Sequence, residues 1–573
     1  MVIYGISAFA GMVVGKASLV PSMPLLDQDQ RTNLDLEVAK QKVHEAISKL
    51  NIQIEEWKKR ASDQKLKTDM LDMQQTILND SAYWQQIVAY LKEKFSPEAA
   101  ALRAAQKHAK ILEELGDPLL SERAQDMNDI GMRLACQITG LPYPDISMLN
   151  SDAILVSDFL SPSSLSAADT THIKGIILHK GSVTSHTAIL ASGLGIPTIV
   201  GCEGVENIKS NETVFLNATG GFAICDLSED DKKSYVDKAE VYNKKQKTLM
   251  KFTNEKVYTS DGIRISTVCN IMDARMADQA LQYGSDGIGL FRTEFLYMGK
   301  EHLPSEEEQF ACYKSVVQKF NGLPVIIRTM DIGGDKNVKC LKLGSEQNAF
   351  LGYRAIRICL DQPDLFRTQL RAILRASAYG NLKIMFPMIS DTAEVIKAKG
   401  ILKQAEQELD KKGVKYNRNI PIGIMIETPA AAILADHFSN LVDFFSIGSN
   451  DLTQYTLAVD RTNQKVAPLY HSLSPGVLRL IANTIRCANY AGIECSVCGE
   501  MAGDPIAIPI LLGLGLKKFS VNPSRLLLLK RLISLVDLET AKKLAEEGLK
   551  LSTAKEVEKL IRDHLQPEYR LWI

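Results

Sequence analysis

The 573-residue chain is predicted to be a multidomain protein: an α/β domain with an inserted all-α bundle, followed by a (β/α)8 barrel of the TIM type. Three observations predict this architecture. The length exceeds what one hydrophobic core can organise, so two to four domains are expected. The hydrophobic period turns helical near residue 22 and strand-like again near residue 150. After residue 255, apolar strands and helical stretches alternate over about 300 residues, which favours a parallel barrel over a doubly wound open sheet.

The amino-terminal half divides into strand-like and helical parts. Residues 1–21 contain short strands, and four more short strands are expected between residues 153 and 216. Between them, apolar residues from Val43 to Trp57 follow spacings of four and three, which is the stripe of an amphipathic helix. Ser96-Pro97 marks the start of another helix. We therefore predict one α/β domain from residues 1–21 and 143–227, with residues 22–142 inserted as a helical domain.

The carboxy-terminal half begins after a charged segment. Residues 228–254 are rich in Asp, Glu and Lys and favour a solvated linker helix. Residues 255–573 are predicted to form the barrel. Seven strand candidates stand out in this part: Ile263–Cys269, Gly287–Phe291, Val325–Thr329, Lys383–Met388, Ile422–Ile426, Phe444–Ile447 and Glu494–Cys498. Because barrel enzymes place their chemistry just past the strand ends, the residues that follow these strands are the candidates for a site.

Composition excludes several classes of function. Apolar residues make up 45% and charged residues 24%, which is ordinary for a globular protein. A net charge of −1 gives no reason to expect nucleic acid or an anionic membrane as a partner. No apolar run approaches the roughly 20 residues that span a bilayer, and no secretion signal is predicted. The ten cysteines are widely spaced, so we expect reduced thiols and a cytoplasmic protein. Cys495 and Cys498 lack the second pair that a zinc site needs.

His186 lies at a predicted junction between a strand and a helix. It is flanked by small hydroxylated residues in the segment Gly181–Ala191. A helix start offers unpaired backbone N–H groups and a positive dipole end, so it suits an anion. A neutral imidazole at that place can attack phosphorus through a ring nitrogen. The alternative is a histidine that only makes structural hydrogen bonds, and this segment alone does not decide between the two.

Charged and polar residues gather at the predicted strand ends of the barrel. They are Arg292, Arg328, Glu427, Asn450, Asp451, Arg461 and Cys498. A single such residue is often part of a surface salt bridge, but a set at one end of one barrel indicates a site. Arginines bind phosphate and carboxylate oxygens in a fork, and two carboxylates beside an asparagine suit Mg²⁺ completed by substrate oxygens and water. The sequence therefore predicts a small ligand that carries both phosphate and carboxylate groups.

Five segments give the chain a family resemblance. The segment Asp443–Arg461 resembles the barrel signature of the PEP-utilising enzymes, and Thr184–Thr187 is similar to their phosphohistidine loop. Three further segments resemble the same family: Gly289–Leu296, Ile327–Lys336 and Cys498–Gly503. Over nearly its full length the chain looks like Enzyme I of the sugar phosphotransferase system, the phosphoenolpyruvate–protein phosphotransferases. The resemblance implies that a phosphoryl group passes from phosphoenolpyruvate to a histidine and then to the phosphocarrier protein HPr, with release of pyruvate.

The resemblance also implies a role for each candidate residue. His186 would be the phosphorylated nucleophile, and Cys498 would protonate the departing enolpyruvate. Glu427 and Asp451 would hold Mg²⁺, with Asp451 also facing the substrate. The residues that would hold phosphoenolpyruvate are Arg292, Arg328, Arg354, Asn450 and Arg461. The helical domain of residues 22–142 would dock HPr, and the barrel would form a homodimer.

Some positions depart from the family pattern. Ser182 stands where a second glycine is usual, Ser192 where an arginine follows the loop, Ala10 where a proline is usual, and Gln74 at a position that is often histidine; Arg133 is retained.

Two alternatives stay open. A pyruvate phosphate dikinase or PEP synthase would share the barrel, but residues 22–142 leave no room for its nucleotide-binding domain. A regulatory paralogue that binds phosphoenolpyruvate without turnover is disfavoured by the full set of barrel residues.

Overall fold

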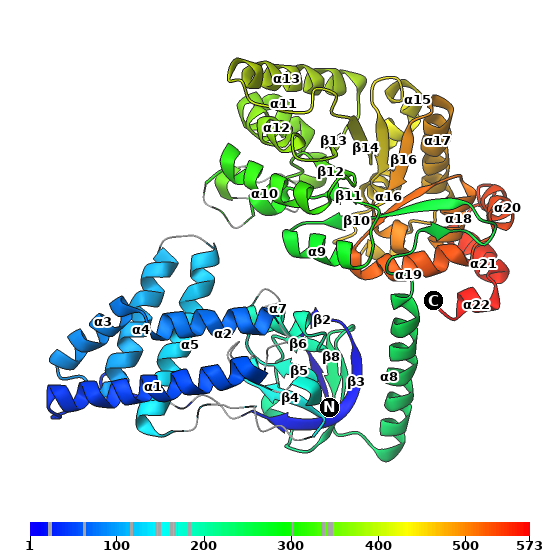
Figure 1. Cartoon of the computed structure of the whole chain (residues 1–573). Coiled ribbons are helices and arrows are strands. Elements are labelled where there is room, and N and C mark those ends of the chain that lie inside the picture. Colours follow the sequence, from blue (N-terminus) through cyan, green and yellow to red (C-terminus); the bar gives the residue numbers. More distant parts are fainter. Residues whose placement is uncertain are drawn as a thin grey trace. The chain divides into compact units, whose positions relative to one another are not determined.

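The computed structural model divides into two compact units, Met1–Gln246 and Lys247–Ile573, and each unit is described by itself (Figure 1). It describes all residues except 21–23, 25, 61–64, 115–117, 142, 144–145, 147–150, 161–163, 166–167, 169, 182–184, 299, 301, 334–338, 342–347 and 464. Three parts of the sequence predictions lie outside the described residues: Ser182, Thr184 of the segment Thr184–Thr187, and residues 334–336 of the segment Ile327–Lys336.

The first unit contains a sheet, which has eight strands among the described residues. Its strands are β1 Val2–Tyr4, β2 Ile6–Phe9, β3 Met12–Leu19, β4 Ala153–Ser157, β5 Ile173–Leu178, β6 Thr198–Val200, β7 Thr213–Asn217 and β8 Phe222–Ile224. They lie in the order β1-β8-β7-β3-β4-β5-β6-β2. Because β3 pairs with both β4 and β7, the first twenty residues share one sheet with strands that follow residue 150. Short helical segments connect the later strands: η1 Thr170–His172, α7 His186–Gly193 and η2 Val205–Asn207.

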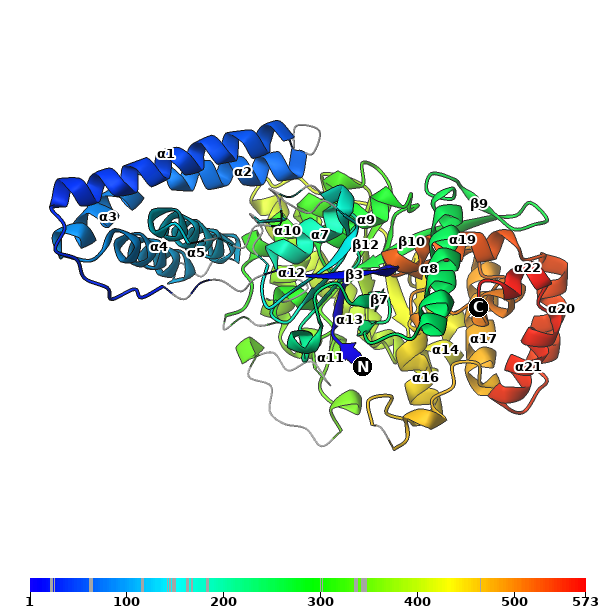
Figure 2. The ribbon, with the colours of Figure 1, turned by 90° about the horizontal axis from the view of Figure 1, so that it is seen from below.

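Among the described residues between β3 and β4, the structure contains five helices. They are α1 Leu36–Arg60, α2 Lys65–Leu78, α3 Ser81–Lys92, α4 Pro97–Glu114 and α5 Pro118–Thr139. Their apolar stripes meet in a hydrophobic core of their own, separate from the core of the sheet. Val43 and Trp57, which the sequence placed on such a stripe, belong to this helical core. Helices α4 and α5 pack closely along each other (Figure 2). A Cβ atom at Gly131 of α5 would come within 2.3 Å of the Ala105 side chain, so this approach requires glycine.

A long charged helix, α8 Glu229–Met250, follows the sheet and spans the boundary between the two units. The ring of Tyr235 stacks on Phe215 of β7, with ring centroids 4.4 Å apart. Beyond the other end of the helix, the buried ammonium group of Lys530 donates hydrogen bonds to the carbonyl groups of Phe252 and Thr253. Tyr235 thus packs the first part of the helix on β7, and Lys530 binds the segment that follows the helix.

The second unit contains a closed barrel. Eight parallel strands occur among its described residues: β10 Arg264–Ile271, β11 Ile288–Phe291, β12 Val325–Arg328, β13 Leu382–Phe386, β14 Ile422–Ile426, β15 Phe444–Ile447, β16 Glu494–Val497 and β17 Lys518–Val521. Neighbouring strands pair in chain order, and β10 pairs with both β11 and β17, which closes the ring. A short strand, β9 Val257–Tyr258, pairs antiparallel with β10. The predicted (β/α)8 barrel is confirmed.

Helices surround the barrel (Figures 1 and 2). Their bounds are α9 Ala274–Gln282, α10 Glu306–Lys319, α11 Ile356–Asp361, α12 Pro363–Ser377, α13 Thr392–Lys411, α14 Pro429–Ile433, α15 Ala435–Phe438, α16 Ser449–Leu457, α17 Pro475–Ala491, α18 Ala507–Gly513, α19 Pro523–Ser534, α20 Leu538–Gly548, α21 Ala554–His564 and α22 Pro567–Arg570. Capping side chains fix several starts; Ser305 and Glu308, for example, form a capping box before α10.

Strand β17 is absent from the seven strand candidates, so Glu494–Cys498, the last of those candidates, is followed by an eighth strand in the barrel. Its four residues, Lys-Phe-Ser-Val, begin with a charge and contain a serine, so no apolar run marks them. Lys518 is nevertheless buried, because its ammonium group pairs with Glu494 on the neighbouring strand at 2.5 Å. An ion pair between Lys518 and the partly exposed Glu494, 24 positions earlier, cannot be read from the hydrophobic pattern.

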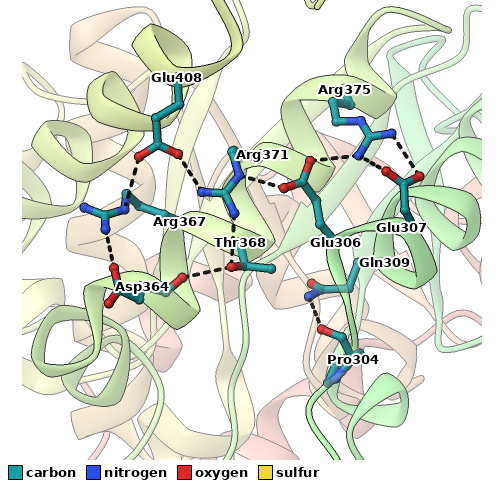
Figure 3. A network of polar contacts seen from close by, with 10 residues as sticks. All are labelled: Pro304, Glu306, Glu307, Gln309, Asp364, Arg367, Thr368, Arg371, Arg375 and Glu408. Atoms are coloured by element: carbon teal, nitrogen blue, oxygen red, sulfur yellow. Dashed lines mark hydrogen bonds and ion pairs between the residues drawn. The ribbon is translucent and has the colours of Figure 1, made fainter. Parts of the chain in front are cut away.

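A network of ion pairs joins the helices on the outside of the barrel (Figure 3). Arg371 of α12 is at its centre and contacts Glu306 of α10 at 2.7 Å and Glu408 of α13 at 2.6 Å. Burial acts to raise the pKa of Glu306, but the guanidinium groups of Arg371 and Arg375 outweigh it and lower that pKa. The network therefore ties three helices together through partly buried charges.

Replacing Arg371 by methionine is expected to lower the free energy of unfolding by about 1 kcal/mol at pH 7, since Glu306 and Glu408 each lose one of two arginine partners. Glu306 has a lowered pKa in the folded state, so its contribution exists above its unfolded pKa of about 4.3 and is lost as the pH falls. Denaturant titrations at pH 7 and pH 3 should show the difference shrinking at pH 3. Lys403→Met, which removes a largely exposed ammonium group from its pair with Glu406, is the control and should change neither curve.

Candidate functional site

One cavity at the carboxyl ends of the barrel strands is lined by all eight residues that the sequence singled out in this half of the chain. They are Arg292, Arg328, Arg354, Glu427, Asn450, Asp451, Arg461 and Cys498. Arg292 follows β11, Arg328 ends β12, Glu427 follows β14 and Cys498 follows β16. Asn450 and Asp451 lie in the first turn of α16, directly after β15. Because parallel strands end at the same rim, the fold brings these distant residues together.

Two of the four arginines are paired with carboxylates of the protein. Arg328 contacts Glu294 at 2.5 Å and Asp331 at 3.0 Å. Arg354 contacts Asp331 at 2.8 Å and Asp451 at 3.5 Å. Since both guanidinium groups are almost fully buried, these contacts balance charges that would otherwise be costly to bury. Arg328 and Arg354 thus belong to the framework of the site as well as to its lining.

The other two arginines, Arg292 and Arg461, have no carboxylate within 4 Å in the part of the chain that the structure describes. Both are partly exposed and line the same cavity. The Nε atom of Arg292 is buried and has no hydrogen-bond partner. Two guanidinium groups that lack an internal counter-charge give the cavity an affinity for an anion, and their forked donors fit phosphate or carboxylate oxygens.

Glu427 is a deeply buried acid of the cavity, with 1% of its surface exposed. Its carboxylate accepts a hydrogen bond from the backbone N–H of Met388 at 2.6 Å, and Met388 adopts a left-handed conformation with φ of 56°. Burial, followed by the negative charges of Asp451 and Asp331, raises the pKa of Glu427 to about 8. Excess negative charge at oxygen ligands is the condition that a divalent cation relieves. The residues present therefore fit Mg²⁺, which Glu427 and Asp451 would hold.

The donor set around Glu427 is incomplete without a ligand. No group of three or more His, Cys, Asp or Glu side chains is spaced to hold a metal ion within the described ranges. Two carboxylates leave most of the six coordination positions of Mg²⁺ to other oxygens. The missing oxygens would come from water and from a bound anion, as the sequence predicted for this site.

The backbone beside Arg354 is tightly constrained. Ala355 has φ of 54° and ψ of −125°, a conformation that alanine rarely adopts, and its N–H donates to the carbonyl of Ile332. A Cβ atom at Gly333 would lie 2.5 Å from the Cβ atom of Arg354, so glycine permits this close approach. Tyr455 adds a further contact, because its hydroxyl accepts a hydrogen bond from Arg354 at 3.1 Å. The position of the Arg354 guanidinium group is therefore fixed from several sides.

Cys498 is buried inside the barrel, at the carboxyl end of β16. Only 3% of it is exposed, and its backbone N–H donates to the carbonyl of Ile447. Burial raises the pKa of the thiol, although Arg328 and Arg292 act against this. A thiol with a raised pKa stays protonated at neutral pH and can act as a proton donor. All ten cysteines are free thiols, as the sequence predicted.

His186 belongs to the other unit. It is the first residue of α7 His186–Gly193, directly after the N-cap residue Ser185, whose hydroxyl accepts a hydrogen bond from the N–H of Ala188. Strand β5 ends at Leu178, so the predicted junction between strand and helix is confirmed. Ser192 lies in the last turn of the same short helix.

Sequence reasoning missed four residues that shape the cavity: Glu294, Asp331, Met388 and Tyr455. The first two carry a signal, since they lie two and three residues after Arg292 and Arg328 in segments that were already singled out. Met388 acts through its backbone and Tyr455 through its hydroxyl group, and neither has a pattern that could be read before the fold was known.

The comparisons with known proteins agree with this geometry. Three family models match: the PEP-binding domain of PEP-utilising enzymes over residues 246–538, their mobile domain over 149–221 and their N-terminal domain over 4–123. A phosphoenolpyruvate-protein phosphotransferase of Mycoplasma capricolum is 41% identical over 98% of this chain and 99% of its own. Proteins of the same name from Geobacillus stearothermophilus and Bacillus subtilis are 39% and 38% identical, again over 98% of this chain and over 97% and 99% of theirs. The chain belongs to the phosphoenolpyruvate–protein phosphotransferase family.

Membership of the phosphoenolpyruvate–protein phosphotransferase family makes the chain a transferase. The similarity covers both units, so the mobile-domain match includes His186 and the PEP-binding match includes the whole arginine-lined cavity. This favours the phosphotransferase over a dikinase or a paralogue without turnover. Within the described residues, no helix is both long and apolar enough to cross a membrane.

Arg292→Met tests the role of the unpaired arginines in a phosphoenolpyruvate–protein phosphotransferase. The rate of protein labelling from limiting phosphoenolpyruvate should fall about a hundredfold, because the cavity would lose one preorganised cation for an anionic substrate. The thermal midpoint should stay within about 2 °C, since no internal ion pair is broken. Arg418→Met, which removes an exposed arginine paired only with Asp410, is the control. An unchanged rate in the Arg292 variant would contradict the assignment.

Proposed function

We propose that the protein transfers a phosphoryl group from phosphoenolpyruvate to His186, releases pyruvate and passes the group on to HPr, as the first step of sugar uptake by the phosphotransferase system. The observation that carries this proposal is the single cavity in which two unpaired arginines, two acids suited to Mg²⁺ and a buried thiol face one another. A phosphate, a carboxylate and a carbon that must be protonated are the three chemical features of phosphoenolpyruvate, and the cavity offers a partner for each.

The chemistry divides between the residues of the cavity. Arg292 and Arg461 bind the anionic groups and reduce the repulsion that a nucleophile would meet. The imidazole nitrogen of His186 forms a bond to phosphorus while the bond from phosphorus to the enol oxygen breaks, and that oxygen keeps the electron pair. The enolate then takes the proton of the Cys498 thiol at C3, the C2 carbonyl reforms, and the thiolate regains a proton from water. Mg²⁺, held by Glu427 and Asp451, would supply charge neutralisation for the phosphoryl group.

Because His186 and the cavity belong to different units, the transfer requires the α/β part of the chain to move between donor and acceptor positions. The helices α1–α5 are our proposed docking surface for HPr. Gln74 is only 2% exposed and Arg133 only 6%, so neither residue offers its side chain to a carrier directly. Residues nearer the surface of the helices must make that contact, and the absence of histidine at position 74 does not by itself remove it.

Two further features belong to the proposal. Free thiols throughout the chain suit a reducing compartment, and we place the protein in the cytoplasm.

We also propose a homodimer formed through the barrel. Sedimentation equilibrium of the whole chain should give twice the mass of 63.3 kDa, and a monomer at micromolar concentration would contradict this.

Removal of Mg²⁺ gives a direct test of the acids. Labelling by phosphoenolpyruvate should stop in excess chelator and return when Mg²⁺ is added. Glu427→Gln keeps the shape of the side chain but removes its charge, so the Mg²⁺ concentration for half-maximal rate should rise more than about tenfold. Labelling that continues in the chelator would show that the carboxylates serve another purpose.

Incubation with ³²P-labelled phosphoenolpyruvate and Mg²⁺ tests the function itself. We expect one label per chain, stable in base and lost in acid as expected for phosphohistidine, together with one pyruvate released. Addition of HPr from the same cell should then move the label to the carrier. A label that is stable in acid, or no label at all, would refute the proposal. Formation of ATP from phosphoenolpyruvate and AMP would favour a dikinase instead.

A further inference from the structure

One polar contact beside the cavity has no part in the chemistry described so far. The side-chain amide of Asn270, near the end of β10, donates hydrogen bonds to the carbonyl of Cys498 at 2.8 Å and to the carbonyl of Ser520 at 3.1 Å. Its oxygen accepts a hydrogen bond of 2.6 Å from the Ser520 hydroxyl. Since the amide must give two hydrogens to carbonyl groups and accept one from a hydroxyl, only one orientation of its oxygen and nitrogen satisfies all three contacts.

This contact joins the ends of three strands. Asn270 lies in β10, Cys498 follows β16 and Ser520 lies in β17, so the amide bridges the place where the barrel closes. The register between β10 and β11 shifts between Cys269 and Asn270, which is the mark of a bulge. Bulges change the direction of a side chain and are frequent next to active sites.

The neighbouring strand leaves room for the bridge. A Cβ atom at Gly289 of β11 would come within 2.3 Å of the Ser520 hydroxyl oxygen and 2.5 Å of a methyl group of Val268. Any other residue at position 289 would push the Ser520 hydroxyl away from Asn270. The bridge therefore depends on three positions that are far apart in sequence.

We propose that Asn270 is a positioning residue for proton transfer by Cys498. By holding the carbonyl group of Cys498, it fixes the peptide from which the thiol extends into the arginine-lined cavity, so that the S–H bond points at C3 of the enolate. The inference rests on the proposed function, because it assigns Asn270 to the proton step of that reaction. The proton passes from sulfur to C3, the enolate electron pair forms the new C–H bond, and the thiolate is reprotonated by water.

The prediction separates two steps of one reaction. Label transfer from phosphoenolpyruvate to His186 needs the arginines and Mg²⁺, whereas exchange of the pyruvate methyl hydrogens with D₂O needs the thiol in the correct place. Asn270→Asp keeps the shape of the side chain but places an oxygen opposite two carbonyl oxygens, so the Cys498 peptide should shift. We expect the exchange rate, followed by proton NMR in the presence of Mg²⁺, to fall more than about tenfold and the labelling rate to fall less than about threefold.

Two further variants complete the design. Asn522→Asp adds the same charge at the same rim while keeping an N-cap side chain for α19, and it should leave both rates unchanged. Ser520→Ala removes the hydroxyl that orients the amide; it is a milder change, and it should lower exchange by a smaller factor than Asn270→Asp. This variant keeps the inference testable if the Asn270 variant folds poorly.

The outcomes are distinct. Equal losses of exchange and labelling in Asn270→Asp, or unchanged exchange in both the Asn270 and Ser520 variants, would overturn the positioning role and leave the proposed function intact. A loss of exchange of similar size in Asn522→Asp would also overturn it, because the effect would then come from charge alone. A native protein that takes no label would refute the proposed function and this inference together.

Discussion

A His186→Ala variant is expected to take no label from phosphoenolpyruvate, at least about 10³-fold below the native protein, while exchange of the pyruvate methyl hydrogens stays within about twofold. The expectation follows from the division of the chain. His186 begins a helix of the first unit, whereas every described group that lines the cavity belongs to the second. If His186 is the acceptor, as proposed, its removal should abolish phosphoryl transfer and leave the proposed proton chemistry of the barrel intact.

The matched control is another histidine at the same end of the sheet. His179 directly follows β5, and its ring nitrogen Nδ1 contacts the carbonyl of Cys202 at 2.9 Å. His179→Ala removes this structural contact and should reduce labelling less than about threefold. Full labelling of the His186 variant, with loss in the His179 variant, would mean that the acceptor was assigned to the wrong residue. Loss of exchange as well as label in the His186 variant would contradict the independence of the two units.

Two arginines with the same predicted role differ in whether carboxylates of the protein pair with them. Arg292 and Arg328 both follow strand ends and were predicted from one rule, that barrel chemistry gathers at the carboxyl rim. The sequence could predict the rim because the hydrophobic pattern marks most of the strands. It could not predict which arginine is neutralised by the protein, because Glu294 and Asp331 reach Arg328 only after the strands have closed. Local pattern therefore predicts which residues meet, and three-dimensional pairing decides what each one does.

The same distinction explains the two chief omissions. Strand β17 was missed because Lys518 is buried through an ion pair with Glu494 that no local pattern reveals. The contact of Asn270 with Cys498 was missed because it spans 228 positions of sequence and involves a backbone carbonyl. The helix start at His186 was predicted correctly, since small hydroxylated residues between an apolar strand and an apolar helix are a local signal.

Arg328→Met is expected to destabilise the barrel as well as to abolish activity. Only 5% of Arg328, 4% of Glu294 and 1% of Asp331 is exposed. Methionine removes the guanidinium group that contacts two buried carboxylates. Loss of one partner of a buried ion pair lowers the free energy of unfolding by about 3–5 kcal/mol. The barrel transition in calorimetry should therefore move down by roughly 10 °C, and labelling should fall more than about 10³-fold. Arg292→Met, which breaks no internal pair, should keep the native midpoint.

A second change separates stability from activity. Glu294→Gln in the Arg328→Met background removes the charge of one of the two carboxylates that contact Arg328, so part of the lost stability should return. Activity should stay lost, because the guanidinium group that faces the substrate is still absent. Arg328→Lys keeps the charge without the fork, and its midpoint should lie between the native and methionine values. If Arg328→Met unfolds at the native temperature, the buried pairs do not stabilise the barrel, and Arg328 belongs with Arg292 as a residue that serves the ligand alone.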